Sequence, residues 1–194
     1  MKVGVLALQG DFREHRISLE RLGADVTEVR LPTQLEGLAG LILPGGESTA
    51  IGKLMVSYNL LEPIREFGKT KAIWGTCAGA ILLAREVGKD QPLLALMDMV
   101  IERNAFGRQI DSFQIDLPVP FLNPPQPDYR LTFIRGPIIT RTFGDAKPLL
   151  SLPDGRVIAA QQNHLLATSF HPELTEDLRF HRYFMELAKL SYTD

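Results

Sequence analysis

The stretch AIWGTCAG, residues 72–79, decides how this chain folds. An apolar run ends at Trp74, and Cys77, the only cysteine of the chain, follows between two glycines. This pattern predicts a strand that turns sharply into a helix, with a thiol at the apex of the turn. Gly75 and Gly79 stand two residues before and after the cysteine, where small residues avoid clashes at a tight bend. The stretch therefore predicts a strand–turn–helix unit that can present a nucleophile.

The position of Cys77 at the start of a helix would also activate its thiol. The helix dipole and the free N–H groups of the first turn favour a thiolate there. The N–H of Ala78, directly after the cysteine, can donate to an oxyanion. An isolated cysteine is more often a small buried hydrophobe. The glycines on both sides favour a nucleophile here.

A histidine and a carboxylate stand two residues apart in SFHPE, residues 169–173. Pro172 pushes His171 into extended geometry, and alternate residues of an extended segment point to the same side. Glu173 can then hold one ring nitrogen of His171 and leave the other for the thiol. These groups, with Cys77, are the parts of a nucleophilic triad. A first-turn helix acid explains Glu173 equally well.

Strands and helices alternate in the first half of the chain, which implies a parallel sheet with helices on both faces and right-handed crossovers. Apolar runs and turn signals predict strands at 3–8, 26–31, 38–43 and 71–74 and helices at 11–22, 48–58, 60–67 and 78–86. Asp11 is the expected N-cap of the first helix.

The second half instead predicts shorter strands at 99–102, 112–117, 131–134, 149–152, 156–160 and 165–170, with a hairpin at Pro153-Asp154-Gly155. A closing helix is expected from Thr175, as its N-cap, to Leu190. The proline-rich stretch 118–127 predicts a surface excursion within one domain. We therefore expect residues 1–194 to form a single α/β domain with extra antiparallel strands in its second half.

The composition excludes several classes of function. The chain has 194 residues, of which 45% are hydrophobic and 23% charged, and its net charge of -2 gives no electrostatic case for nucleic acid or an anionic membrane. We expect no membrane span, because no apolar run approaches about 20 residues. The N-terminal apolar stretch is interpreted as a buried strand, not a signal peptide. One cysteine fits a reducing compartment, so a cytoplasmic location is expected.

The segment GGES, residues 45–48, follows the third predicted strand, where backbone N–H groups can form a cradle for an oxyanion or a carboxylate. Its spacing to Gly52 and Lys53 does not fit a phosphate loop. We expect no cofactor and no metal, because the scattered histidines and single cysteine show no ligand spacing. His15, His181 and, for the most part, His164 are expected to be structural or solvated, although His164 could line the edge of a site.

Several motifs together resemble a known family. PGGES at 44–48, GTCAG at 75–79 and SFHPE at 169–173 resemble the class I, triad-type glutamine amidotransferases. Within that family the chain is most similar to the glutaminase subunits of pyridoxal 5′-phosphate synthases. The segments that carry this closer resemblance are LALQG at 6–10, REH at 13–15, ERN at 102–104, FGRQ at 106–109, FIR at 133–135 and HPELTED at 171–177. The resemblance implies a flavodoxin-like fold over nearly the whole chain.

The resemblance also implies a reaction and its residues. Cys77 would attack the side-chain amide of L-glutamine, His171 would move the proton, and Glu173 would orient His171. Backbone N–H groups near Gly46 and of Ala78 would stabilise the oxyanion. The positions that match the family's substrate-binding residues are Gly46, Glu47, Ser48, Arg103, Ile134 and Arg135. A surface salt bridge would also explain the two arginines.

The implied partner is a separate synthase subunit that receives the ammonia within a large hetero-oligomer and builds pyridoxal 5′-phosphate. Three alternatives stay open on the sequence. The chain could be the glutaminase subunit of another amidotransferase, an unrelated cysteine hydrolase on the same fold, or a non-catalytic regulatory binder. The presence of Cys77, His171 and Glu173 together argues against the last of these.

Overall fold

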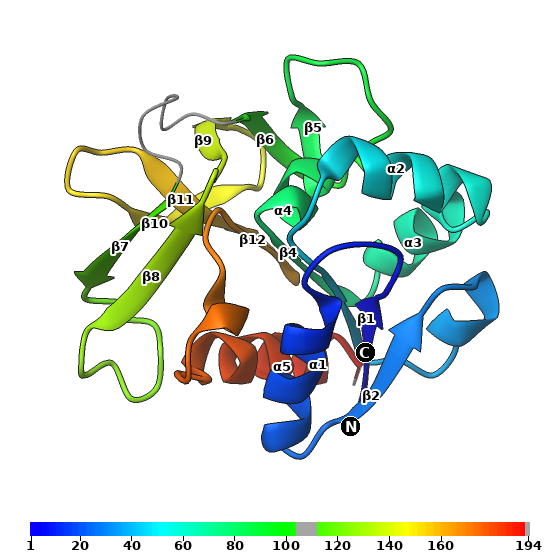
Figure 1. Ribbon diagram of the computed structural model, residues 1–194, viewed down its shortest axis with the longest axis horizontal. Helices are drawn as coiled ribbons and strands as arrows, with labels where there is room; N and C mark the ends of the chain where they lie inside the picture. The colour runs from blue at the N-terminus through cyan, green and yellow to red at the C-terminus, as the bar shows by residue number, and fades with distance from the viewer. Residues whose placement is uncertain (104–111, 193–194) are drawn as a thin grey trace.

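The computed structural model describes residues 1–103 and 112–192, and its centre is a row of five parallel strands (Figure 1). The strand order is β2-β1-β3-β4-β12, and each neighbouring pair is parallel. These strands span Lys2–Leu6 (β1), Asp25–Val29 (β2), Gly40–Leu43 (β3), Ala72–Thr76 (β4) and Leu165–Thr168 (β12). The order is that of flavodoxin-like sheets, in which ligands bind at the carboxyl ends of the strands near the β1/β3 switch point.

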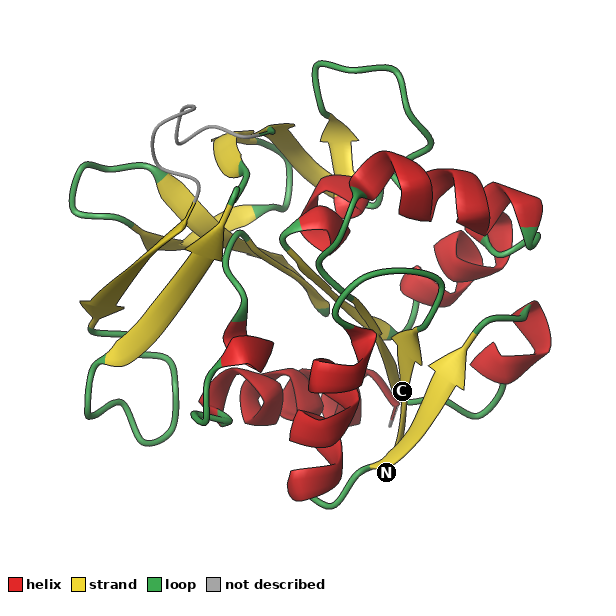
Figure 2. Cartoon of the chain, in the orientation of Figure 1, coloured by secondary structure: helices red, strands yellow, loops and turns green. Residues whose placement is uncertain are grey.

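Helices cover both faces of this sheet, as Figures 1 and 2 show. α1 (Phe12–Arg21) and α5 (Arg179–Tyr192) lie on one face, while α2 (Ser48–Ser57), α3 (Leu61–Gly68) and α4 (Ala78–Leu83) lie on the other. Strand side chains alternate between two cores: Leu41 and Leu43 pack with α2–α4, and Ile42 packs with α1 and α5. Continuous apolar runs are expected of strands that are buried on both faces.

Antiparallel strands extend the sheet beyond β12. β11 (Val157–Gln162), β9 (Ile138–Thr142) and β6 (Met97–Glu102) follow in this order, and β10 (Lys147–Ser151) pairs with β11. β5 (Ala84–Glu86) lies at the edge and is parallel to β6. β7 (Ser112–Leu117) and β8 (Tyr129–Ile134) form a separate two-stranded sheet. Two short 3-10 helices are η1 (Pro32–Leu35) and η2 (Pro172–Leu174). The predicted single-domain α/β class, with antiparallel strands in the second half, is confirmed.

The structure corrects several predicted elements. α4 ends at Leu83, and 84–86 form a strand, because the N–H groups of Leu94 and Leu96 bond the carbonyls of Leu82 and Leu83 and bring the returning chain against the helix end. β9 was not predicted from the sequence. Asp11 is at the N-cap of α1 but makes no side-chain capping bond.

The predicted start of the last helix was also wrong. α5 begins at Arg179, four residues after Thr175. Thr175 instead donates through Oγ1 to the carbonyl oxygen of Pro172, at 3.0 Å, and so closes η2. Asp177 accepts the N–H of Arg179 at 3.0 Å, which satisfies a backbone donor at the start of α5.

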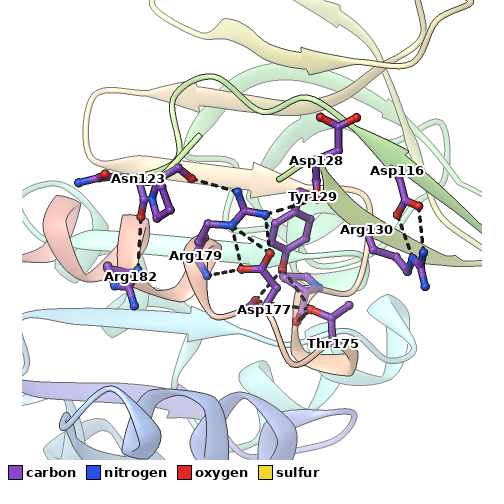
Figure 3. Close-up of polar contacts among 11 residues, drawn as sticks. Asp116, Asn123, Asp128, Tyr129, Arg130, Thr175, Asp177, Arg179 and Arg182 are labelled. Atoms are coloured by element: carbon purple, nitrogen blue, oxygen red, sulfur yellow. Dashed lines mark hydrogen bonds and ion pairs between the residues drawn. The ribbon is translucent and has the colours of Figure 1, made fainter. Parts of the chain in front are cut away.

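The proline-rich stretch 118–127 connects β7 to β8 as a loop, as expected, but part of it is buried. Val119 and Leu122 pack into the core with α5. The buried Arg179 donates to the carbonyl oxygen of Pro124 and ion-pairs with Asp177 (Figure 3). α5 therefore anchors this loop through both apolar and polar contacts. Within residues 1–103 and 112–192, no helix has the length and apolarity needed to cross a membrane.

Candidate active site

Cys77 occupies a strained turn between β4 and α4. Its backbone has φ 48° and ψ -104°, a region that residues with side chains rarely adopt. A Cβ on Gly75 would lie 2.4 Å from the backbone of Gly79, and a Cβ on Gly79 would lie 2.0 Å from the carbonyl oxygen of Leu43. The predicted need for small residues on both sides of the cysteine is therefore confirmed. Strain of this kind is typical of a nucleophile turn.

His171 and Glu173 form the predicted pair after β12. His171 Nδ1 lies 2.7 Å from Glu173 Oε1, and both side chains are buried. Glu173 belongs to the 3-10 helix η2 instead of an extended segment, so the expected contact arises from a different backbone geometry. The N–H of His171 donates to the carbonyl oxygen of Thr132 at 2.8 Å, which ties the histidine to β8.

The thiol and the imidazole are present in one site without a hydrogen bond between them. Cys77 Sγ is 3.9 Å from the carbonyl oxygen of Ile134, and His171 Nε2 is buried without a hydrogen-bond partner among the described residues. Catalytic hydrogen bonds are often long in free enzymes and tighten in the substrate complex. His171 Nε2 is therefore the ring nitrogen left for the thiol.

The electrostatics of His171 favour its charged form. Burial alone would lower its pKa, but contacts with Cys77 and Glu173 outweigh burial and raise the pKa of His171 to about 10. Burial also raises the pKa of the Glu173 carboxyl group, against the opposing effect of His171. An imidazolium between two acidic groups is suited to holding a proton that is later given to a leaving group.

A cavity of about 460 Å³ brings the predicted site residues together. This volume suits a small-molecule ligand. The side chains and backbone that line it come from the ends of β1, β3, β4, β8 and β12, from the start of α4 and from the segment after β6. The lining residues are Asp11, Gly46, Glu47, Ser48, Cys77, Ala78, Ile81, Arg103, Ile134, Arg135 and His171.

Arg103 and Glu47 form an ion pair beside this cavity. Arg103 Nη2 lies 3.0 Å from Glu47 Oε1, and its Nη1 lies 3.0 Å from Gln91 Oε1. Glu47 also caps α2 by accepting the N–H groups of Thr49 and Ala50, at 3.1 and 2.7 Å. Burial would raise the pKa of Glu47, but these N–H groups and Arg103 lower it. Opposite charges therefore stand side by side where a ligand would enter.

Asp11 is a site residue that sequence reasoning missed. It was predicted only as a helix cap, but its Oδ2 lies 3.5 Å from His171 Nδ1 and it lines the cavity. Burial raises the pKa of Asp11, while His171 lowers it. Its place directly after the first strand of a parallel sheet was the available signal, because carboxyl ends of such strands meet at the site.

Asp11, His171 and Glu173 are grouped closely enough to be considered as a metal site. The atoms with which they could coordinate a metal ion all lie within 4.8 Å of one another, a grouping that the sequence spacing did not suggest. In this arrangement His171 Nδ1 faces Glu173 as a hydrogen-bond donor. A cation there would need the same nitrogen without its proton. The hydrogen bond between His171 and Glu173 thus favours proton handling over metal binding.

The remaining histidines divide into two kinds. His15 and His181 are fully buried and in contact, with His15 Nδ1 3.0 Å from His181 Nε2. His164 bonds the carbonyl oxygen of Gly68 at 2.9 Å, at the amino end of β12, and does not line the cavity. The expectation that His164 could line a site edge is not met. The motif positions Asn104, Phe106, Gly107, Arg108 and Gln109 lie outside the described residues.

Comparisons with known proteins agree with this fold and site. A solved structure described as a glutamine amidotransferase superposes on the chain with a TM-score of 0.90 and 49% identity, covering 96% of this chain and 98% of that one. The fold is thus of the glutamine amidotransferase class. The model of the SNO glutamine amidotransferase family matches residues 5–190, and the chain belongs to this family.

Similar curated proteins carry a more specific name. The pyridoxal 5′-phosphate synthase subunit PdxT of Roseiflexus castenholzii is 53% identical over 96% of this chain and all of that protein. The PdxT subunit of Deinococcus radiodurans is 54% identical over 97% of each chain. The resemblance predicted from the sequence motifs is therefore confirmed over nearly the full length.

Proposed function

We propose that this chain is the glutaminase subunit of a pyridoxal 5′-phosphate synthase and hydrolyses L-glutamine to L-glutamate and ammonia. The observation that carries the proposal is a single cavity lined by Cys77 at its strained turn, by His171 and by Arg103. His171 is held by the buried Glu173 at 2.7 Å. The family match and the names of the similar proteins support the same activity.

The reaction proceeds in two steps. Cys77 Sγ attacks the side-chain amide carbon of glutamine, and the proton that His171 holds on Nε2 passes to the leaving ammonia as the thioester forms. Water, deprotonated by the same nitrogen, then attacks the thioester carbonyl and releases glutamate with the thiol restored. Glu173 keeps the imidazole oriented throughout. N–H groups of Gly46 and Ala78 bind the oxyanion of each tetrahedral intermediate.

The other lining residues bind the amino acid. Arg103 pairs through its planar fork with the α-carboxylate of glutamine. Glu47 offers a carboxylate for the α-ammonium group, and Ser48 lies next to it at the start of α2. Ile134 and Arg135 contribute the wall that continues from β8, where Arg135 has a positive φ of 48°. Their place around one cavity supports this assignment.

Ammonia passes directly to a synthase subunit within a large hetero-oligomer. Transfer without release is chemically useful because ammonia that is protonated in water is no longer a nucleophile. Residues 1–194 act as one glutaminase domain in this complex. A reducing cytoplasm is the proposed location, since Cys77 must stay a free thiol to react.

The test mixes the chain with the synthase subunit of the same organism, glutamine and the sugar phosphate substrates. Glutamate and pyridoxal 5′-phosphate are measured together. We expect coupled formation of both, and loss of both in Cys77→Ala. Added ammonium salt should restore cofactor formation, but not glutamate, in the variant. Glutamate formation without the coupled cofactor would overturn the pathway, and unchanged glutamate formation by Cys77→Ala would overturn the mechanism.

A further inference from the structure

Two buried histidines that the proposed reaction does not use lie directly behind the triad. His15 belongs to α1 and His181 to α5, and their side chains are fully buried. His15 Nδ1 lies 3.0 Å from His181 Nε2, and His15 Nε2 lies 3.4 Å from Glu173 Oε2. A continuous row of polar groups thus runs from His181 through His15 and Glu173 to His171.

The two oxygens of Glu173 have different surroundings. Oε1 is engaged by His171 Nδ1 at 2.7 Å. Oε2 is buried and has no hydrogen bond among the residues that the structure describes, although His15 Nε2 faces it. An unpaired buried carboxylate oxygen is costly, so a donor at this position would stabilise the charged form of Glu173.

The tautomer of His15 follows from its neighbours. Burial lowers the pKa of His181 to about 3, and burial together with the nearby His181 and His171 lowers the pKa of His15 well below its usual value. Both rings are therefore neutral near pH 7, with one N–H each. A proton on His15 Nε2 is shared between two acceptors: it bonds the hydroxyl oxygen of Thr76 at 3.0 Å, and Glu173 Oε2 lies 3.4 Å from the same nitrogen.

The opposite tautomer is disfavoured at both ends of the row. It would turn the lone pair of His15 Nε2 toward the Glu173 carboxylate. It would also place the proton of His181 on Nδ1, which is buried and has no partner among the described residues. A buried N–H without an acceptor is rarer than an unused acceptor. His181 therefore donates through Nε2 and fixes the proton of His15 on Nε2.

We infer that His15 is a positioning residue of the triad, whose Nε2–H holds the second oxygen of Glu173, and that His181 sets the tautomer required for this. The inference rests on the proposed function, because it assigns a role in the same reaction. In this proposal the 3.4 Å separation of His15 Nε2 and Glu173 Oε2 shortens to a hydrogen bond when substrate fixes the imidazole.

The other ionisable groups near Glu173 do not supply this donor. Asp11 Oδ2 is 3.5 Å from His171 Nδ1, and burial raises the pKa of Asp11. Burial also raises the pKa of Tyr129, whose hydroxyl donates to the carbonyl oxygen of Asp177 at 3.0 Å. Neither group competes with His15 for Glu173 Oε2.

Three variants separate a positioning role from simple packing. At position 15, a glutamine side chain can place its amide N–H near the position of the His15 Nε2–H. An asparagine side chain places its amide N–H nearer the position of Nδ1, and a leucine side chain offers no donor. Glutaminase activity is measured with the synthase subunit present. We expect His15→Leu and His15→Asn to lose about tenfold or more in kcat with little change in KM for glutamine, as is typical when an orienting partner is removed. His15→Gln should retain most of the activity.

A second readout does not depend on glutamine turnover. The rate at which iodoacetamide alkylates Cys77 is measured against pH. Loss of the donor makes Glu173 easier to protonate, so the acidic limb of this profile should move to higher pH in His15→Leu but not in His15→Gln. His164→Leu is the matched control, because it removes an imidazole at the opposite end of β12 and should match the wild type.

Each result of these two assays either supports or contradicts a positioning role for His15. Wild-type behaviour of His15→Leu in both assays, or equal losses in His15→Gln and His15→Leu, would overturn it. If His15→Leu does not fold, the difference between the glutamine and asparagine variants decides, and equal activity of those two is the contrary result. A wild-type chain that makes no glutamate would instead remove the proposed function, while the alkylation profiles would still test His15.

Discussion

Gly79 lies so close to β3 that a Cβ on this glycine would come within 2.0 Å of the carbonyl oxygen of Leu43. The contact is with backbone, which cannot move aside as a flexible side chain can. It locks the first turn of α4 against the strand that precedes the Gly45-Gly46 turn. Cys77, the proposed nucleophile, and the proposed oxyanion cradle are thus held together through a backbone contact.

This contact predicts a large effect of Gly79→Ala. We expect it to lower the free energy of unfolding by about 2 kcal/mol or more, because overpacking against backbone forces α4 away from β3. Gly23→Ala is the control: it has a positive φ of 80°, but nothing lies near its Cβ position. Denaturant unfolding of both variants gives the comparison. Gly79 lies in α4 and lacks such a positive φ, so a loss in Gly79→Ala no larger than that in Gly23→Ala would show that the clash with Leu43 is relieved at little cost.

The buried histidines predict instability in acid. The unfolded chain binds a proton at His181 below pH 6.5, whereas the folded chain resists protonation until about pH 3. The stability contributed by the neutral ring is therefore present above pH 6.5 and lost as the pH falls toward 3.

Each such group should contribute a slope of about 1.4 kcal/mol per pH unit within this window. Unfolding free energies of the wild type and His181→Gln, measured from pH 7 to pH 4, test this. The variant should show a shallower decline. Parallel curves would mean that His181 is protonated in the folded state.

The ion pair at the cavity predicts a binding role for Arg103. Arg103→Lys keeps the charge but loses the planar fork that contacts Glu47 and Gln91. We expect KM for glutamine to rise about 10- to 100-fold, the range for hydrogen bonds to charged groups, with a smaller change in kcat. Arg85→Lys, an exposed pair with Asp98, is the control. An unchanged KM would assign the substrate carboxylate to another group.

The anchor of the proline-rich loop predicts a purely structural effect. Arg179→Lys removes the bonds to the carbonyl oxygens of Pro124 and Asp128 and should cost about 1 to 3 kcal/mol of stability. KM for glutamine should stay unchanged. Arg130→Lys, an exposed pair with Asp116 in the same region (Figure 3), should change stability little. A raised KM in Arg179→Lys would link this loop to the site.

The parts of the fold that sequence predicted best are those with a strong local signal. Continuous apolar runs marked the parallel strands, and the glycines around Cys77 marked its turn. The end of α4 and the edge strand after it were missed because tertiary bonds from Leu94 and Leu96, distant in the sequence, set that boundary. The start of α5 was misplaced because Thr175 is an equally good partner for η2.

The candidate site shows the same division. Motifs located Cys77, His171 and the glycine turn after β3, since each follows a strand directly. His15 and His181 were set aside as ordinary helix histidines, because a helical position gives no sign of what the opposite ring will touch. Their contact spans 166 positions of the chain and needs the packing of α1 against α5 to be seen.

The ion pair between Arg103 and Glu47 favours ligands that carry both a positive and a negative charge. Each side chain neutralises the charge of the other. A ligand with a single charge would pair with one of them and leave the other without a counterion. A zwitterion such as a free amino acid exchanges both partners at once and leaves the net charge of the pocket unchanged. In the proposed binding mode, Arg103 and Glu47 each act as the counterion that the opposite end of glutamine would replace.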